Sequence, residues 1–383
     1  MPESPEFPAV IVRAEIGIGR LTLNRPAALH ALNTAMCELM IEALLAWRGE
    51  AAVEAVLIDH SGERGFCAGG DIRMLAESGA GDGAAARRFF FTEYQLNALL
   101  FDYPKPVITI MDGVTMGGGV GLSMPSRYRV ATERTNFAMP ETGIGLFPDV
   151  GGGWHLPRLP GETGMWLALT GARLHGADCL ALGIATHFVE SGQVDALKTA
   201  LTNPAHPRES GDPGFLSSGA GVSEKSLDPR LRGDERIKNV LAYFEADPGP
   251  APIAAQRADI DRLFAHDSVE AIFAALAADP SGWARAQLET LQTKSPQTLK
   301  LAFRQLREGA RIASFADEMA VEYRIGARVV QRHDFLEGVR AVIVDKDNAP
   351  RWDPADLEGV TTAMLDGIFA PLPADEEWRA LPG

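Results

Sequence analysis

Two glycine-rich turns constrain the fold of this chain more than any other feature. Residues 66–71 (FCAGGD) follow the strand-like run 55–60, and residues 115–122 (TMGGGVGL) follow the strand-like run 106–111. Each segment indicates a strand, a glycine turn and the start of a helix. Glycine lets a ligand approach the backbone closely, and the first turn of a helix leaves N–H groups without internal partners at the positive end of its dipole. Two such turns facing one cleft would hold a developing oxyanion between two peptide N–H groups.

A pair of carboxylates lies downstream, in residues 139–153 (MPETGIGLFPDVGGG), a stretch with no other charged residue. Glu141 and Asp149 stand eight positions apart among apolar residues and glycines. Burying an unpaired carboxylate costs free energy and raises its pKa, so a chain seldom keeps two such groups in an apolar setting without a use. This segment is therefore the first place to look for chemistry.

These motifs, taken in order, resemble the crotonase (enoyl-CoA hydratase/isomerase) superfamily. The likeness covers most of the chain, through residues 67–71, 116–121, 140–153, 169–174, 183–189, 294–296 and 333–341. One glycine motif alone would be a weak signal, whereas this many matches in one order is a strong one. The resemblance implies an α/β fold, a crotonase-like spiral of ββα units with a C-terminal helical region.

The acids separate the branches of this superfamily. By resemblance, hydratases carry one glutamate shortly after the GGG turn and a second in the Pro-Glu motif, but the first position is Gly121 here. The hydrolase pattern keeps the Pro-Glu acid and adds an aspartate in the Phe-Pro-Asp turn. Glu141 and Asp149 match both of these positions.

The resemblance also assigns substrate contacts. It implies an oxyanion hole made by the backbone N–H groups of Ala68 and Gly118, and a substrate-side contact by Glu93. For coenzyme A it implies contacts from Arg25, Ala68 and Asp71. A surface position for Arg25 is an equal alternative, and Asp71 also suits a helix cap.

The implied activity is hydrolysis of the 3-hydroxyisobutyryl thioester of coenzyme A to 3-hydroxyisobutyrate and free coenzyme A, in valine breakdown. Glu141 would either attack the polarised carbonyl, giving a mixed anhydride that water opens, or deprotonate a water that attacks directly. Both routes stay open. Asp149 is expected to accept a hydrogen bond from the 3-hydroxyl group, which discriminates against substrates without it. No cofactor is expected, since coenzyme A is part of the substrate, and no metal site is indicated.

Other interpretations compete with this one. Glu141 could be a buried acid satisfied by backbone N–H groups, Asp149 could serve a tight turn, and Glu93 could lie on a solvated helix face. Cys67 adjoins the first glycine turn and would suit thioester cleavage as a thiol nucleophile, but no His or Asn partner is apparent. At the level of function, the alternatives are a hydratase or isomerase on the same scaffold and a non-catalytic acyl-CoA-binding protein.

Composition limits the partners. A chain of 383 residues with 46% hydrophobic content can bury a full core. The formal net charge of −15 argues against nucleic acid and anionic membrane surfaces as partners. The sequence has no apolar run of about 18 residues, and its first residues lack the basic character of a signal or transit peptide, so a cytoplasmic location is expected. An acyl-CoA is the expected partner, and the sequence leaves a homo-oligomer open.

Periodicity and composition divide the chain into three parts. Strand and helix signals alternate over residues 1–202, the crotonase-like core, where a helix is expected after Asn33. Residues 203–234 are rich in Gly, Pro, Ser and charge, which predicts a flexible, solvent-exposed insertion. Residues 235–383 form a helical region that, by resemblance, covers the acyl-CoA site. Apolar residues recur there at helical spacing over 259–264, 269–277, 298–307 and 319–330.

Overall fold

The computed structural model describes residues 8–202 and 229–382. A six-stranded sheet has the order β1-β2-β3-β5-β7-β9, and a three-stranded sheet has the order β4-β6-β8. β1 and β2 are antiparallel, and all other neighbouring strands are parallel. The strands are β1 (Val10–Glu15), β2 (Gly17–Leu23), β3 (Val53–His60), β4 (Gly65–Cys67), β5 (Val107–Met111), β6 (Val114–Met116), β7 (Tyr128–Ala131), β8 (Asn136–Ala138) and β9 (His187–Phe188).

One repeated unit builds both sheets. β3 in the larger sheet is followed by β4 in the smaller sheet and then by α2; β5 is followed in the same way by β6 and α4. β7 and β8 then lead into a 3-10 helix, η2 (Glu141–Ile144). Each pass of the chain therefore adds one strand to each sheet, which confirms the predicted spiral of ββα units.

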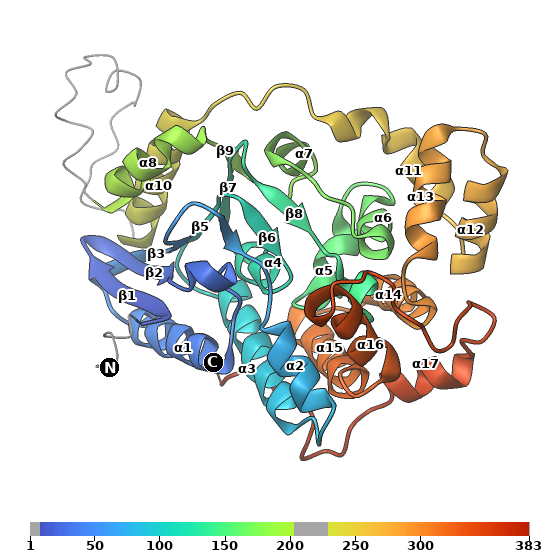
Figure 1. Cartoon of the computed structure of the whole chain (residues 1–383). Coiled ribbons are helices and arrows are strands. Elements are labelled where there is room, and N and C mark those ends of the chain that lie inside the picture. The colour runs from blue at the N-terminus through green and yellow to red at the C-terminus, as the bar shows by residue number, and fades with distance from the viewer. Residues whose placement is uncertain (1–7, 203–228, 383) are drawn as a thin grey trace.

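Helices surround the two sheets (Figure 1). The first begins where predicted, because the Asn33 side chain caps it by accepting a hydrogen bond from the Met36 N–H (2.9 Å). The four predicted C-terminal segments correspond to α11, α12, α14 and α15. The helices are α1 (Thr34–Arg48), α2 (Ile72–Gly79), α3 (Ala84–Phe101), α4 (Gly118–Ser123), α5 (Gly152–His155), α6 (Thr163–Thr170), α7 (Gly176–Ala181), α8 (Val194–Thr202), α10 (Pro229–Phe244), α11 (Arg257–Phe264), α12 (Val269–Ala278), α13 (Gly282–Gln292), α14 (Pro296–Gly309), α15 (Phe315–Val329), α16 (His333–Val339) and α17 (Thr362–Phe369).

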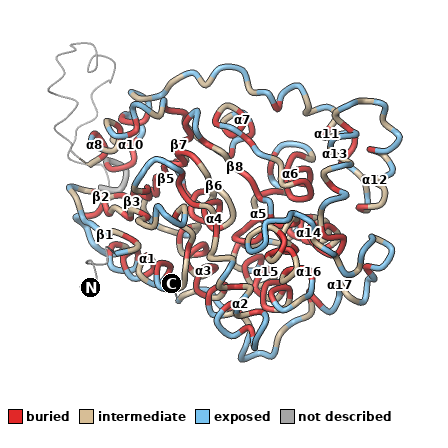
Figure 2. The backbone as a smooth tube through the Cα atoms, in the orientation of Figure 1, coloured by how far each residue is buried: buried red, intermediate tan, exposed pale blue. Residues whose placement is uncertain are grey.

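β3, in the middle of the larger sheet, is covered on both faces, which explains its mostly apolar residues. Val56 and Ile58 of β3 belong to the main core, whereas Ala55 and Leu57 belong to a second core that α8 and α10 close. Alternate residues of a strand point to opposite faces, so a strand covered on both sides is apolar throughout. Figure 2 shows the central strands buried and the connecting loops exposed.

The predicted insertion extends too far toward the C-terminus. Residues 203–228 lie outside the described residues, but residues 229–234 belong to α10. Asp234 is buried there, accepts a hydrogen bond from Tyr128 Oη of β7 (2.6 Å) and pairs with Lys238 (2.9 Å). A helix attached to the sheet in this way is not a loop, so the insertion has to end before residue 229. The division into three parts otherwise stays a prediction.

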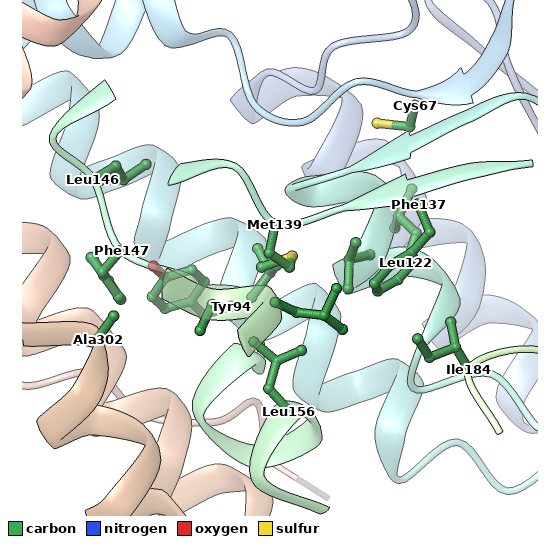
Figure 3. Close-up of a cluster of buried hydrophobic side chains, with 14 of the residues drawn as sticks. Cys67, Tyr94, Leu122, Phe137, Met139, Leu146, Phe147, Leu156, Ile184 and Ala302 are labelled. Carbon is green, nitrogen blue, oxygen red and sulfur yellow. The ribbon is translucent and has the colours of Figure 1, made fainter. Parts of the chain in front are cut away.

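The C-terminal helices pack against the elements that carry the candidate site. α15 contacts α3, α16 contacts α2 and η2, and α14 contacts α5. Figure 3 shows part of the buried cluster at this junction. It includes Tyr94 from α3, Phe147 from the segment between η2 and α5, and Ala302 from α14. The C-terminal helices therefore pack against the elements that carry the site residues.

Candidate active site

A small pocket of about 70 Å³ lies beside α2, α3 and η2. It contains both glycine turns and the carboxyl side chains of Glu93, Glu141 and Asp149, which are at most 5% exposed. The rest of its lining is mostly apolar: Ile72, Leu75, Phe89, Phe90, Met116, Pro140, Ile144 and Leu146. An apolar hollow with a few convergent polar groups is the usual form of a small-molecule site.

Parallel pairing brings the two glycine turns together. β4 and β6 are neighbours in the smaller sheet, so the turns that follow them leave the same edge. Gly69 (φ +119°) and Gly117 (φ +46°) adopt positive φ, which glycine tolerates and other residues rarely adopt. A Cβ added at Gly117 would lie only 3.1 Å from the Gly69 Cα. The expectation that both turns face one cleft is confirmed.

The structure corrects one of the two expected oxyanion donors. The Ala68 N–H donates to the Leu29 carbonyl (3.0 Å), so it is not free to bind a substrate. By contrast, the N–H groups of Gly70 and Gly118 donate no hydrogen bond within the described part of the chain, and Gly118 is the first residue of α4. The oxyanion role predicted for Ala68 is therefore wrong, and Gly70 and Gly118 supply the available pair of donors.

Glu141 is the first residue of η2 and lies beside the second glycine turn. A Cβ added at Gly117 would lie 3.4 Å from Glu141 Oε1, and Glu141 Oε2 has no hydrogen-bond partner among the described residues. Burial raises the pKa of Glu141 well above its ordinary value, and the neighbouring Asp149 raises it further. A structural acid would be satisfied by nearby donors, so this geometry favours a chemical role.

Asp149 faces the same pocket from the turn before α5. Tyr94 Oη donates a hydrogen bond to Asp149 Oδ2 (2.9 Å), a contact that was not predicted from the sequence. Burial raises the pKa of Asp149 to about 7, although the Tyr94 hydrogen bond opposes this. Near neutral pH the group is therefore present both as an acceptor-only carboxylate and as a neutral acid.

Glu93 is buried on the inner face of α3, so a solvated helix position is excluded. Its Oε1 has no hydrogen-bond partner among the residues described, and a Cβ added at Gly118 would lie 2.6 Å from that oxygen. Burial, and then the charge of Asp149, raises the pKa of Glu93 well above its ordinary value. The pocket thus holds three carboxyl groups, and the charge of Asp149 opposes the ionisation of the other two.

Arg25 and Asp71 lie outside the pocket lining. Arg25 Nη2 and Asp71 Oδ2 are 3.5 Å apart, and both side chains are about a third exposed or less (27% and 32%). Asp71 caps α2 by accepting a hydrogen bond from the Met74 N–H (3.4 Å), as the capping interpretation predicts. Their contacts with coenzyme A stay a prediction.

The thiol alternative fails. Cys67 is fully buried, and its Sγ donates to the carbonyls of His30 (3.3 Å) and Gly69 (3.6 Å). Burial raises the pKa of the Cys67 thiol to about 12. The thiolate needed for attack is therefore scarce at neutral pH.

Gly121 leaves no room for a second glutamate. A Cβ added at Gly121 would lie 2.7 Å from the Val150 Cβ and 2.8 Å from Asn97 Nδ2. The Asn97 side chain is held in place by the hydrogen bond that it donates to the Gly121 carbonyl (3.1 Å). The acid that the hydratase pattern requires at this position would have to displace both neighbours.

Named relatives share most of this sequence. A protein named 3-hydroxyisobutyryl-CoA hydrolase, mitochondrial, from Danio rerio is 44% identical over 354 residues, which cover 92% of this chain and 87% of the relative. Proteins of the same name from Gallus gallus and Homo sapiens are 42% and 39% identical, covering 95% and 92% of this chain and 89% and 86% of theirs. These names include a mitochondrial location, so the expected cytoplasmic location is not supported. Across the described residues, no helix has the length and apolar character needed to span a bilayer.

Solved structures share the whole fold. A carnitinyl-CoA dehydratase from Mycobacterium thermoresistibile matches with a TM-score of 0.84 at 39% identity, covering 96% of this chain and 97% of that one. An enoyl-CoA hydratase from Rhodobacter sphaeroides 2.4.1 matches with a TM-score of 0.83 at 36% identity, covering 97% and 100%. The sequence model described as enoyl-CoA hydratase/isomerase matches residues 18–369. By fold, pocket and sequence, this chain belongs to the enoyl-CoA hydratase/isomerase family.

Proposed function

We propose that this chain hydrolyses the thioester of 3-hydroxyisobutyryl-CoA to 3-hydroxyisobutyrate and free coenzyme A, a reaction of valine breakdown. Relatives at 39–44% identity carry the name of this hydrolase. One observation carries the proposal: Glu141 and Asp149 line one pocket with Gly70 and Gly118, whose N–H groups have no partner among the described residues.

The two glycine N–H groups would bind the thioester oxygen. Donors aimed at the place where negative charge develops lower the barrier, and removing one typically costs about 3–4 kcal/mol. The aromatic rings of Phe89 and Phe90 line the same pocket and would exclude bulk water. Charge interactions are stronger in such a dry site than in solvent.

Glu141 would carry out the bond cleavage by one of two routes. In the first, its carboxylate attacks the carbonyl carbon, the coenzyme A thiolate leaves and takes up a proton, and water opens the mixed anhydride. In the second, it takes a proton from a water that attacks the carbonyl and delivers that proton to the departing sulfur. Both routes need the ionised carboxylate and consume one water. The reaction calls for no separate cofactor, because coenzyme A is part of the substrate.

Asp149 would select the hydroxylated acyl group. Tyr94 occupies Asp149 Oδ2, which leaves Oδ1 for the 3-hydroxyl of the substrate. A substrate without this hydroxyl would leave a buried carboxyl unpaired, and such a mismatch is discriminated strongly. Glu93 Oε1, which has no hydrogen-bond partner among the described residues, would contact the substrate from α3, next to Gly118.

The rival functions fit the pocket less well. Two solved relatives are named as a dehydratase and a hydratase, which makes hydration the main alternative. Gly121 stands where the hydratase pattern has its second glutamate. Val150 and Asn97 leave no room for a larger side chain there. A protein that only binds acyl-CoA would have no need of three buried carboxyl groups, since each costs free energy.

Release of free thiol separates these functions. The chain would be incubated with 3-hydroxyisobutyryl-CoA, isobutyryl-CoA and crotonyl-CoA, with thiol measured by a thiol reagent and the enoyl group by absorbance. We expect thiol release, fastest from the hydroxylated thioester, and no loss of enoyl absorbance. Hydration of crotonyl-CoA without thiol release would overturn the proposal in favour of a hydratase. The absence of both thiol release and hydration would overturn it in favour of a binding protein.

A further inference from the structure

The turn that carries Asp149 has a strained backbone. Val150 adopts φ +53° and Gly151 adopts φ +91°. A β-branched residue at positive φ is a true outlier, and such a conformation persists only where its surroundings hold it. Asp149 directly precedes Val150, so the contacts that hold this turn also direct the Asp149 side chain.

Two buried side chains from the C-terminal helices hold the turn on both sides of Asp149. Glu322 of α15 accepts hydrogen bonds from the Gly151 N–H at Oε2 (2.8 Å) and from the Gly153 N–H at Oε1 (3.0 Å). Gln305 of α14 donates from Nε2 to the Pro148 carbonyl (2.9 Å) and to Glu322 Oε1 (3.2 Å). The turn is therefore fixed one residue before Asp149 and again two and four residues after it.

Glu318 provides a natural contrast. It lies one helical turn before Glu322 in α15, and both side chains are fully buried. It also packs against the turn, because a Cβ added at Gly153 would overlap its carboxyl group. Neither of its oxygens accepts a hydrogen bond from the turn. Two buried glutamates on the same helix thus differ in whether they bond to the Asp149 turn.

We propose that Glu322 is a positioning residue that directs Asp149 into the pocket through the N–H groups of Gly151 and Gly153, and thereby sets the preference for 3-hydroxylated acyl groups. The inference rests on the proposed role of Asp149. Glu322 is not part of the pocket lining, so it acts through the turn and not on the substrate. This gives the C-terminal helices a part in specificity although the pocket is lined by residues 68–149.

The substitution Glu322→Gln isolates this role. Glutamine keeps the size of the side chain but offers one acceptor oxygen, and its NH₂ group cannot accept the second N–H of the turn. Each carboxyl oxygen of Glu322 accepts one N–H of the turn, so the variant loses one of these two bonds. Glu318→Gln is the matched control, since it loses no bond to the turn.

The test compares kcat and KM for 3-hydroxyisobutyryl-CoA and isobutyryl-CoA in both variants, with thermal melting as a check of folding. In Glu322→Gln we expect the kcat/KM ratio of the hydroxylated to the unhydroxylated substrate to fall about tenfold or more, because a small misplacement of a contact group is costly. Glu318→Gln should leave the ratio unchanged. An unchanged ratio in folded Glu322→Gln, or an equal fall in Glu318→Gln, would overturn the inference.

Asp149→Asn separates failure of this inference from failure of the proposed function. If Asp149→Asn leaves the ratio unchanged, the proposed role of Asp149 fails. If it lowers the ratio, adding Glu322→Gln should lower it no further, and additive losses would overturn the inference. Should Glu322→Gln not fold, Gln305→Met removes the bond to the Pro148 carbonyl and should lower the ratio in the same direction, with no change counting against the inference.

Discussion

Replacing Asp149 by asparagine should stabilise the folded chain increasingly as the pH rises, although it removes a group proposed to contact the substrate. Burial raises the pKa of Asp149 from 3.8 to about 7. The stability that this bound proton contributes is complete below pH 3.8 and is lost as the pH rises to about 7, because the unfolded chain releases the proton first. One pKa unit corresponds to about 1.36 kcal/mol, so the full loss is about 4 kcal/mol. Asp149→Asn does not titrate and avoids this loss.

The pH dependence of the difference is the quantity to measure, because it cancels any constant cost of burying the amide. An asparagine carbonyl can still accept the hydrogen bond that Tyr94 gives to Asp149 (2.9 Å). In urea unfolding, the variant should gain about 2 kcal/mol on the natural chain between pH 5.5 and pH 8, about half of the full loss. A difference that stays constant or reverses over this range would refute the argument that burial raises this pKa.

Other changes test the pocket and the sheet. Because burial and a neighbouring carboxyl raise the pKa of Glu141, kcat/KM should fall on acidification with a midpoint well above 4.5, the ordinary pKa of glutamate; a pH–rate profile with a midpoint at 4.5 would contradict this. Gly118→Ala should lower kcat about tenfold or more, since the added Cβ would lie 2.6 Å from Glu93 Oε1 in the pocket. Gly192→Ala is the control, because its added Cβ meets no atom within 4 Å. Equal turnover of the two variants in steady-state assays would contradict this. Asp59→Asn should destabilise the chain by about 3 kcal/mol in urea unfolding, because Arg20 loses a buried ion-pair partner at 2.7 Å, and an unchanged midpoint would count against it.

The fold was predictable where local signals and the order of motifs agreed. The strand-like runs at 55–60 and 106–111 correspond to the central strands β3 and β5. These runs are mostly apolar because each strand contributes residues to a core on either face. The end of the insertion was misplaced because residues 229–234 have the composition of a loop. Their helix is held instead by contacts such as that of Asp234 with Tyr128, more than 100 positions away, and tertiary contacts override local propensity.

The site was predictable at the level of residues but not of hydrogen bonds. The family resemblance predicted substrate contacts for Glu93, Glu141 and Asp149, and all three line one pocket. It could not tell which amide in the first glycine turn is free, because the Leu29 carbonyl that occupies the Ala68 N–H comes from a distant segment. The supports of Asp149 were also hidden, since Tyr94 lies 55 positions before it and Glu322 bonds to the turn across 171 positions. No local pattern links residues so far apart.

Thiol release by Glu141→Gln would show whether this glutamate cleaves the thioester. The amide keeps the shape of the side chain but neither attacks a carbonyl nor deprotonates water. We predict that kcat for 3-hydroxyisobutyryl-CoA falls by about 10²–10⁴-fold while KM and the melting temperature do not worsen, because the glycine donors and the pocket remain. Turnover by Glu141→Gln at the rate of the natural chain would contradict the account.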